Sequence, residues 1–327
     1  MLKYLLRRVI TWTLMILAAT NLTYFLASWA LNPKANYIGR RPPIPDDQLD
    51  RMMAKYNLSD RTPLLRRWWT WLTDIVTHWN WGFSPVGDSV NAQISYRVWI
   101  SFELMLAATV LTVVVGVAIG VYTASRQYRF ADRFFQWTSI ITMNIHIVVA
   151  ALLVVMLGVG INRILGRTVF YVAGSASPVG VSGPWVVVDS LQHLVLPTLA
   201  LVLVGYSSYH FLQRALLLDN ISADFVRTAR AKGLTKDQAI RRHALRTSLI
   251  PVATQVAFTI PGIFTGAVLT ESLFGWRGMG SYFIETISKN DIHGVVAVAA
   301  FGALMTAIGA ILADAAVVVL DPRVRVN

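Results

Sequence analysis

The candidates for catalysis or metal binding in this sequence are the serine of one short motif and six scattered histidines. Gly205-Tyr206-Ser207 begins a Gly-x-Ser-Gly motif of the kind found in intramembrane serine proteases, but position 208 is serine and the motif is incomplete. The chain has no Gly-x-x-x-x-Gly-Lys-Ser/Thr loop for nucleotide phosphates, and its histidines lack metal-binding spacing. Because cysteine is absent, disulfides and thiolate metal sites are excluded. We therefore expect no catalytic site, and no metal or cofactor bound by this chain.

Three acidic residues fall at the ends of apolar segments or inside them: Glu103, Glu271 and Asp314. A charged side chain at the centre of a bilayer costs about 2.5–3.5 kcal/mol, so each should face a partner or an aqueous cavity. We expect Glu103 to start a membrane span and to reach the interface. Glu271 should lie near the end of a span that is kinked or unwound at 261–262, where packing and gating are open alternatives. For Asp314 we favour helix packing.

A basic segment between two apolar segments, 213–248, carries strong local signals for structure. Ser222 is a suitable N-cap for a helix with Asp224 in its first turn and cations in its last turns. Gly233 can then adopt the left-handed conformation that ends a helix. Thr235 and Gln238 have the spacing of a capping box for a second helix. The sequence therefore predicts an elbow of two short helices joined at Gly233.

The elements that position these groups are membrane-spanning helices. The 327 residues are 55% hydrophobic and only 14% charged, with a mean hydropathy of +0.54, whereas soluble domains carry about 25% charged residues. Only helices satisfy every backbone group within a single span, so we predict an all-α membrane protein. Six apolar segments exceed the ~20 residues that cross ~30 Å of hydrocarbon: 9–31, 99–123, 134–157, 191–212, 249–273 and 294–320. The first is too long for a signal peptide, so we expect a retained helix.

The distribution of lysine and arginine predicts the orientation of these spans. With the N-terminus inside, the segments 1–8, 124–133, 213–248 and 321–327 hold 16 cations, against 4 in the two short outer loops. Cytoplasmic loops carry the excess of cations, so both termini should be cytoplasmic. The expected organisation is an N-terminal transmembrane helix (1–31), an extracytoplasmic segment (32–98), a five-helix core (99–320) that contains the elbow, and a cytoplasmic tail (321–327).

The extracytoplasmic segment gathers tryptophans in its second half. Because tryptophan is common at membrane interfaces, we favour an interfacial location over a specific aromatic ligand site, with packing into a small lid as a further alternative. The residues concerned are Trp68, Trp69, Trp71, Trp79 and Trp81.

Three functions compete for the basic elbow. A DNA-binding helix-turn-helix would need a third helix, whereas the elbow runs directly into spans, so no nucleic-acid partner is expected despite the net charge of +12. A lipid-binding amphipathic segment explains the charge but does not require two capped helices. The third function is that of a docking element for another protein.

The residues of the elbow resemble the cytoplasmic coupling loop of ABC importer permeases, in particular the dipeptide/oligopeptide/nickel branch. The similar segments are DFVRTARAKGL at 224–234 and RRHALRTSLIPVAT at 241–254. The wider family has an E-A-A-x-x-x-G pattern followed by I-x-L-P, and the departures seen here resemble the peptide branch. The matching positions are Arg227, Thr228 and Ala229 for E-A-A, Gly233 for the glycine, and His243, Leu245 and Arg246 for I, L and P.

Further segments extend the resemblance over nearly the whole chain: RVWISFEL (97–104), HLVLPTLAL (193–201), LTESLFGWRGMGSYF (269–283) and DPRVR (321–325). At two places the sequence differs from the family's usual pattern, and the local backbone conformation there is expected to differ as well. Arg277 stands where the family usually has proline, and NIH at 144–146 replaces a stretch that contains proline.

The resemblance implies a type I ABC importer permease in a bacterial inner membrane, one of two transmembrane subunits of an ATP-driven importer of short peptides. Nickel or a chelated metal is the alternative substrate, and a secondary transporter with inverted repeats is the alternative class. The implied partners are a second homologous permease, two cytoplasmic ATPase domains that bind ATP and Mg²⁺, an extracytoplasmic substrate-binding protein and membrane lipid. Glu103, Glu271 and Asp314 become candidates for the translocation path or its gate. The implied coupling residues are Arg227, Thr228, Ala229, Arg230, Lys232, Gly233, Arg241, Arg242, His243 and Leu245.

Overall fold

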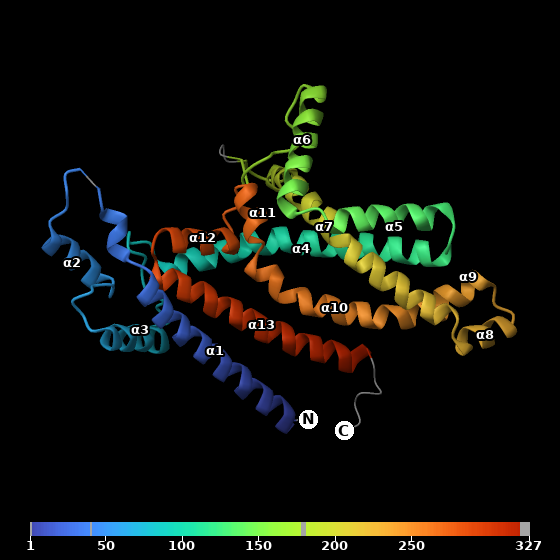
Figure 1. Ribbon diagram of the computed structural model, residues 1–327, viewed down its shortest axis with the longest axis horizontal. Helices are drawn as coiled ribbons and strands as arrows, with labels where there is room; N and C mark the ends of the chain where they lie inside the picture. The colour runs from blue at the N-terminus through green and yellow to red at the C-terminus, as the bar shows by residue number, and fades with distance from the viewer. Residues whose placement is uncertain (1, 40, 178–180, 321–327) are drawn as a thin grey trace. The chain divides into compact units, whose positions relative to one another are not determined.

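The structure is a computed structural model that describes residues 2–39, 41–177 and 181–320, with side chains described for 7–39, 41–177 and 181–312 (Figure 1). Within these ranges the chain is helical, and its only β-pairing is an isolated bridge between Phe83 and Ser89. This confirms the predicted all-α class. Six helical stretches of the described chain are long and apolar enough to cross a membrane: Arg7–Ala30, Val90–Ser125, Ile147–Leu165, Trp185–Ile221, Lys236–Leu273 and Ile292–Leu312.

The chain divides into two compact units. The first contains α1 (Leu2–Ala30), the 3₁₀ turn η1 (Pro33–Tyr37), α2 (Asp46–Lys55), α3 (Leu64–His78), the start of α4 (Val90–Ser125), α11 (Val268–Leu273), α12 (Met279–Ser288) and most of α13 (Ile292–Leu320). The second contains the rest of α4, α5 (Phe130–Met143), α6 (Ile147–Leu165), α7 (Trp185–Ile221), α8 (Asp224–Ala231), α9 (Lys236–Ala239), the π turn η2 (Ile240–Ala244) and α10 (Leu245–Thr265).

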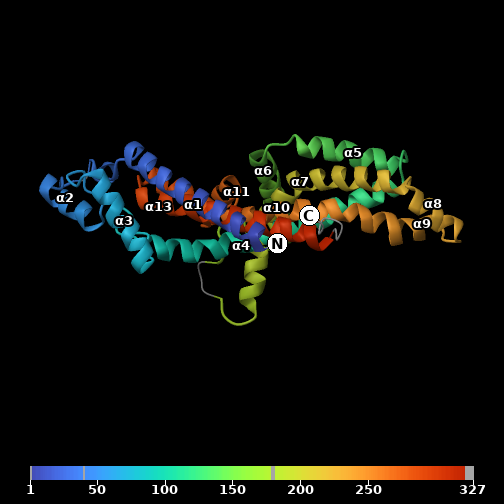
Figure 2. The same cartoon turned by 90° about the horizontal axis from the view of Figure 1, so that it is seen from below.

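In the first unit, α2 and α3 lie at the C-terminal end of α1 (Figures 1 and 2). Trp71 of α3 stacks on Tyr24 of α1 with the ring centroids 4.7 Å apart, and both side chains are buried. Met53 and Leu58 extend the same apolar core. Because α4 begins at Val90, the predicted extracytoplasmic segment 32–98 includes the first nine residues of this helix.

An ion-pair network ties the loop after α1 to α2 in the same unit. Lys34 Nζ lies 2.7 Å from Asp50 Oδ1, and an Arg61 guanidinium nitrogen lies 2.6 Å from Asp50 Oδ2. The hydrogen bond from Lys34, aided by the charge of Arg61, holds the pKa of Asp50 below its usual value. The segment is therefore folded by its own contacts.

In the second unit, α7 packs against both α5 and α6, and α5 lies alongside α7 in both views (Figures 1 and 2). Gly116 and Gly120 of α4 are one turn apart and face α7. A Cβ at Gly116 would lie 2.5 Å from the Tyr206 carbonyl oxygen, and one at Gly120 would lie 2.8 Å from Gln213 Cβ. The two glycines thus allow the close approach that small-xxx-small patterns give to membrane helices.

Two predicted spans are wrong in their internal structure. The segment 134–157 is not one helix, because α5 ends at Met143 and α6 begins at Ile147. His146 caps α6 by accepting a hydrogen bond from the Val148 N–H at Nδ1. The predicted kink at 261–262 is also wrong, because α10 continues through both of its prolines to Thr265. The interruption falls at Gly266, whose φ of +78° no helical residue adopts.

Candidate functional site

The first half of the elbow is α8, and its N-terminus differs from the prediction. The N-cap is Ala223, in an extended conformation, and not Ser222. The Ser222 hydroxyl donates back to the carbonyl oxygens of Leu218 and Asp219 and therefore belongs to the end of α7. Asp224 lies in the first turn of α8, as predicted, where the helix dipole favours an anion.

The turn after α8 has the predicted local chemistry. Gly233 has a φ of +97°, and the side chain of Thr235 accepts a hydrogen bond from the Gln238 N–H. The Gln238 side chain accepts one in return from the Thr235 N–H, which completes the capping box. The second helix of the elbow is only one turn long, since α9 passes through the π turn at 240–244 directly into α10.

The inward face of the elbow is an apolar core within the second unit. Val226 and Ala229 of α8 are buried against Leu217 of α7, together with Ala239 and Ile240. Ala229, one of the coupling residues that the family resemblance implied, is therefore buried within the elbow and does not face a partner. Its methyl group helps to hold the elbow together, and a large side chain there would disrupt the elbow itself.

The outward face of the elbow is basic with one aromatic residue. Phe225 of α8 is 43% exposed. The exposed side chains that accompany it are Arg227, Thr228, Arg230, Lys232, Arg241 and Arg242, whereas His243 and Leu245 are half-buried. Sequence reasoning missed Phe225, and its neighbours Asp224 and the buried Val226 gave no local signal that its ring would be exposed.

Gly233 offers a direct test of the bend. A Cβ at Gly233 meets nothing within 4 Å, so Gly233→Ala should cost only the left-handed strain, about 1 kcal/mol or more. We expect the variant to insert normally and its elbow to be cut faster by trypsin. Gly160→Ala is the matched control, because Gly160 also has open space but lies within α6, where alanine is favoured. Equal cleavage of the two variants would contradict the predicted strain.

A buried ion pair supports α7 two turns before the elbow. Arg214 Nε and a terminal guanidinium nitrogen donate to the two carboxylate oxygens of Asp132 at 2.8 and 2.9 Å. The Tyr128 N–H and the Gln136 amide also donate to this carboxylate. Burial acts to raise the pKa of Asp132, but these donors outweigh it and the pKa is lowered. The pair fixes the start of α5 to α7, and no local sequence signal joins residues 82 positions apart.

Above this pair, α7 carries further buried polar residues. His210 has Thr123 Oγ1 3.1 Å from Nε2 and Ser139 Oγ 2.7 Å from Nδ1. Ser207, the serine of the incomplete motif, donates to the Val204 carbonyl oxygen. Because His210 is occupied by Thr123 and Ser139, it does not pair with Ser207 as a nucleophile and base would.

Glu271 is enclosed by hydrogen-bond donors within the first unit. Its side chain is fully buried, and its Oε1 accepts from Ser101 Oγ at 2.6 Å while Oε2 accepts from the Ser281 N–H at 2.9 Å. Ser101 Oγ in turn accepts from the Met279 N–H at 2.7 Å. The carboxylate therefore joins α4, α11 and α12. Of the two alternatives left open for Glu271, this geometry favours packing over gating.

Glu103 and Asp314, the other two acidic candidates, lie in different surroundings from Glu271. Glu103 is exposed and is the fourteenth residue of α4, whose first nine residues belong to the predicted extracytoplasmic segment. An exposed carboxylate within a membrane helix needs a polar partner, an aqueous cavity or the interface beside it. Asp314 belongs to α13, but its side chain lies outside the described residues.

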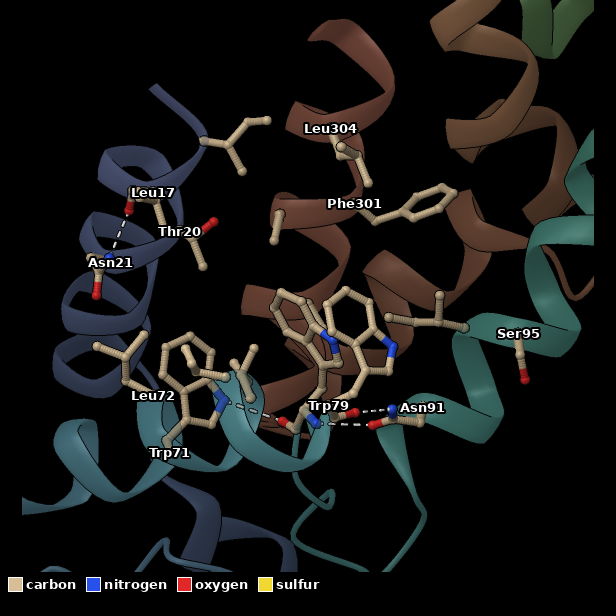
Figure 3. A pocket seen from close by; sticks show the side chains of 17 residues that line it. Leu17, Thr20, Asn21, Trp71, Leu72, Trp79, Asn91, Ser95, Phe301 and Leu304 are labelled. Carbon is tan, nitrogen blue, oxygen red and sulfur yellow. Dashed lines mark hydrogen bonds between the residues drawn. The ribbon is translucent and has the colours of Figure 1, made fainter. Parts of the chain in front are cut away.

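Three of the five tryptophans, Trp71, Trp79 and Trp81, line an apolar pocket of 390 Å³ in the first unit (Figure 3). Trp71 is buried, whereas Trp79 is 67% exposed, so these residues do not form a uniform interfacial belt. The Asn91 side chain accepts from the Trp81 N–H and donates to the Trp79 carbonyl oxygen (Figure 3). These contacts support the alternative in which the tryptophans pack together as a small folded element.

The fold and the elbow define a class of protein: a multi-pass, all-α membrane protein with a structured basic elbow between two of its spans. The chain belongs to the family of binding-protein-dependent transport system inner membrane components, whose family model matches residues 116–326. It is thus a permease subunit of the inner membrane, and the secondary-transporter alternative is set aside. Membership of a transport family also agrees with the expectation that this chain is not itself an enzyme.

Curated relatives cover the whole chain. The oligopeptide transport system permease protein OppB of Mycobacterium tuberculosis is 36% identical over 328 residues, with 100% of both chains covered. The dipeptide transport system permease protein DppB of Bacillus subtilis is 30% identical, covering 100% of this chain and 99% of the relative. The oligopeptide permease AppB of the same organism is 27% identical, covering 99% of this chain and 100% of the relative.

Proposed function

We propose that this chain is one of the two transmembrane subunits of an ATP-driven importer that carries short peptides across the bacterial inner membrane. The peptide substrate is supported by the names of relatives that align along their full length, which refer to oligopeptide and dipeptide transport. The nickel alternative has no such support among these names. The proposed assembly includes a second, homologous permease as a heterodimer, two ATPase domains that bind ATP and Mg²⁺, and an extracytoplasmic substrate-binding protein.

The proposed orientation places both termini and the elbow in the cytoplasm. The excess of lysine and arginine in the segments assigned to that side supports it. Glu103 is the acid best placed for the translocation path, because it is exposed along a membrane helix.

The elbow is proposed as the element that receives the movement of the ATPase. The observation that carries this proposal is its two-sided packing: Val226 and Ala229 fix α8 to α7 from inside, while Phe225, Arg227 and Arg230 remain outside. A rigid helix that is anchored on one face and presents an aromatic residue among cations on the other is suited to a groove in a partner. Aromatic and arginine side chains dominate such contacts.

The test is Phe225→Ala combined with Arg230→Gln in the reconstituted complex. Truncating an aromatic anchor typically costs about 2 kcal/mol, a loss of affinity of roughly 30-fold. We expect ATPase subunits to be lost on purification and peptide-stimulated ATP hydrolysis to fall, with the permease still folded. Because the ATPase is made in the cytoplasm, its binding also depends on the proposed orientation.

Phe130→Ala is the matched control, because Phe130 is 84% exposed but starts α5, outside the elbow. Its ATPase content and hydrolysis should equal those of the parent. If the Phe225 and Arg230 variant retains the ATPase and its coupling, the elbow is not the coupling element.

A further inference from the structure

The second unit contains a basic cavity of 520 Å³ at the C-terminal end of α4. Its basic side chains come from two places in the chain. Arg126 and Arg129 follow α4, while Lys236 and Arg241 come from α9 and the π turn. Asp237 is the acid that lines the cavity with them. Four cations against one carboxylate give this concave surface a strong positive potential.

These cations are not neutralised by the described part of the chain. None of the four has a carboxylate oxygen within ion-pair distance among those residues, Asp237 included. Arg126 donates to the Tyr122 hydroxyl at 2.8 Å and lies over its ring, 4.6 Å from the centroid. This contact orients the guanidinium without cancelling its charge. The cavity is therefore complementary to an anion from outside the chain.

The position of the cavity indicates which kind of anion it would bind. The apolar helix α4 ends at Ser125, and Arg126 and Arg129 come within the next four residues. Basic residues that follow the cytoplasmic end of a span attract anionic lipid headgroups. Tyr122 is one turn inside, as expected for an interfacial aromatic residue. Val121, Ile240 and Leu245 supply an apolar wall beside the cations. A cavity that is basic on one side and apolar on the other fits an amphiphile.

The cavity walls are held in place by the elbow. The capping box of Thr235 and Gln238 fixes α9, from which Lys236 extends. Ile240 lines the cavity and is also buried in the apolar core with Val226 and Ala229. The Leu245 N–H bonds to the Ile240 carbonyl oxygen in the π turn, and π turns often occur at functional sites. Occupation of the cavity would thus stabilise the same residues that anchor α8.

We propose that this cavity binds the phosphate group of an anionic phospholipid, and that the bound lipid stabilises the elbow. Arg126, Arg129 and Lys236 hold the phosphate oxygens, since guanidinium and ammonium groups form charge-assisted hydrogen bonds with phosphate. The glycerol and first methylene groups of the lipid contact the wall of Val121 and Ile240. Lipid binding in this cavity does not depend on which substrate the permease carries.

The test uses the purified complex, short-chain phosphatidylglycerol as the probe, and native mass spectrometry to measure its binding. The variant is Arg126→Gln, Arg129→Gln and Lys236→Gln together. Each cation near a membrane surface contributes roughly a five-fold gain, so losing three should weaken binding on the order of 100-fold. The control is Arg66→Gln, Arg163→Gln and Arg167→Gln, three exposed arginines that do not line the cavity, and it should bind like the parent.

Further measurements separate the lipid from other anions. Excess inorganic phosphate should not displace the lipid, because it lacks the apolar part, and short-chain phosphatidylcholine should bind much more weakly. In the presence of phosphatidylglycerol, trypsin should cut the elbow of the parent more slowly. Unchanged lipid binding in the cavity variant, equal competition by inorganic phosphate, or loss of the ATPase subunits without any loss of lipid would each overturn the proposal. The last result would make the cavity part of the ATPase contact.

Discussion

Replacing Asp132 by alanine should destabilise the protein by about 3 kcal/mol, the lower end of the range for breaking a buried ion pair. Asp132 is almost fully buried and accepts four hydrogen bonds, two of them from Arg214. Its removal leaves the Arg214 guanidinium inside the protein without a counter-charge. The lower end applies because Arg214 keeps 17% of its side-chain exposure and can be partly solvated. The measurement is the midpoint of thermal unfolding in detergent.

The double variant Asp132→Leu with Arg214→Met tests whether the loss of stability comes from the unpaired charge of Arg214 or from the loss of packing at these two positions. Replacing a buried pair by apolar residues of similar size often costs little, so this variant should recover much of the lost stability. Asp224→Ala is the control for an exposed pair, because Asp224 lies 3.6 Å from Arg227 on the surface and should change the midpoint little. If Asp132→Ala and Asp224→Ala behaved alike, the buried pair would not support the second unit.

The sign of the pH dependence follows from the lowered pKa of Asp132. A carboxyl group with a depressed pKa stabilises the fold above its unfolded pKa of about 3.9, and this stability is lost as the pH falls through the folded value. The difference between the parent and Asp132→Asn should therefore be constant near neutral pH. It should disappear only in acid, below about pH 4.

The sequence predicted features that depend on neighbouring residues. The structure confirms the bend at Gly233 and the capping box of Thr235 and Gln238. Both could be predicted because their hydrogen bonds join residues that are only three positions apart in the sequence. Length and apolar content, which require no knowledge of packing, predicted six spans, and each overlaps a spanning helix of the described chain, although the third was placed too early, at 134–157 in place of Ile147–Leu165. Ser222 shows the limit of local rules. Its hydroxyl had carbonyl oxygens of α7 within reach and bonded to them, so it did not cap α8.

Features that depend on distant residues were not predictable in the same way. Hydropathy is continuous over 134–157, so the break between α5 and α6 was hidden although Asn144 and His146 provide caps. Arg214 and Asp132 were assigned to separate cytoplasmic loops, and nothing in either loop indicated a partner. The inward direction of Ala229 depends on Leu217, which belongs to the preceding helix. A family pattern gives the position of such a residue but not the direction of its side chain.

The same limit applies to the acids. Glu103 and Glu271 looked alike in sequence, since each is a single carboxylate in an apolar segment. The structure separates them, because Glu103 is exposed on α4 while Glu271 is buried among donors from residues 101 and 281. One acid is available to partners or water, and the other is held by the chain itself. Substituting each should therefore produce different kinds of defect.

Glu271→Ala should be among the most destabilising single changes in this chain, at about 3 kcal/mol or more. It removes the acceptor for the Ser101 hydroxyl and the Ser281 N–H, and each unpaired buried donor costs about 1–3 kcal/mol. The lost side chain also leaves a cavity. Gly266 and Gly278 pack so closely on the carboxylate that a Cβ at Gly278 would lie 2.7 Å from Oε2. No other side chain can move in from these positions to replace it.

Glu271→Gln and Glu103→Ala complete the comparison. Glutamine keeps the volume and one acceptor oxygen, and its amide can donate to Ser101 Oγ, so its cost should be well below that of alanine. Glu103→Ala should leave the thermal midpoint almost unchanged, because the Glu103 side chain makes no hydrogen bond or ion pair within the described chain. Any defect of Glu103→Ala should appear in peptide uptake by cells that contain normal amounts of the complex.

Stability and uptake together decide between packing and gating for Glu271. A packing residue lowers the midpoint and the amount of folded protein, and the remaining molecules transport normally. Ser101→Ala should reproduce part of this loss, and its effect should not add fully to that of Glu271→Ala, since both variants break the same hydrogen bond. If Glu271→Ala kept the parent midpoint while uptake ceased, Glu271 would act in the gate. Its enclosure by Ser101 and Ser281 would then be one state of a contact that opens during transport.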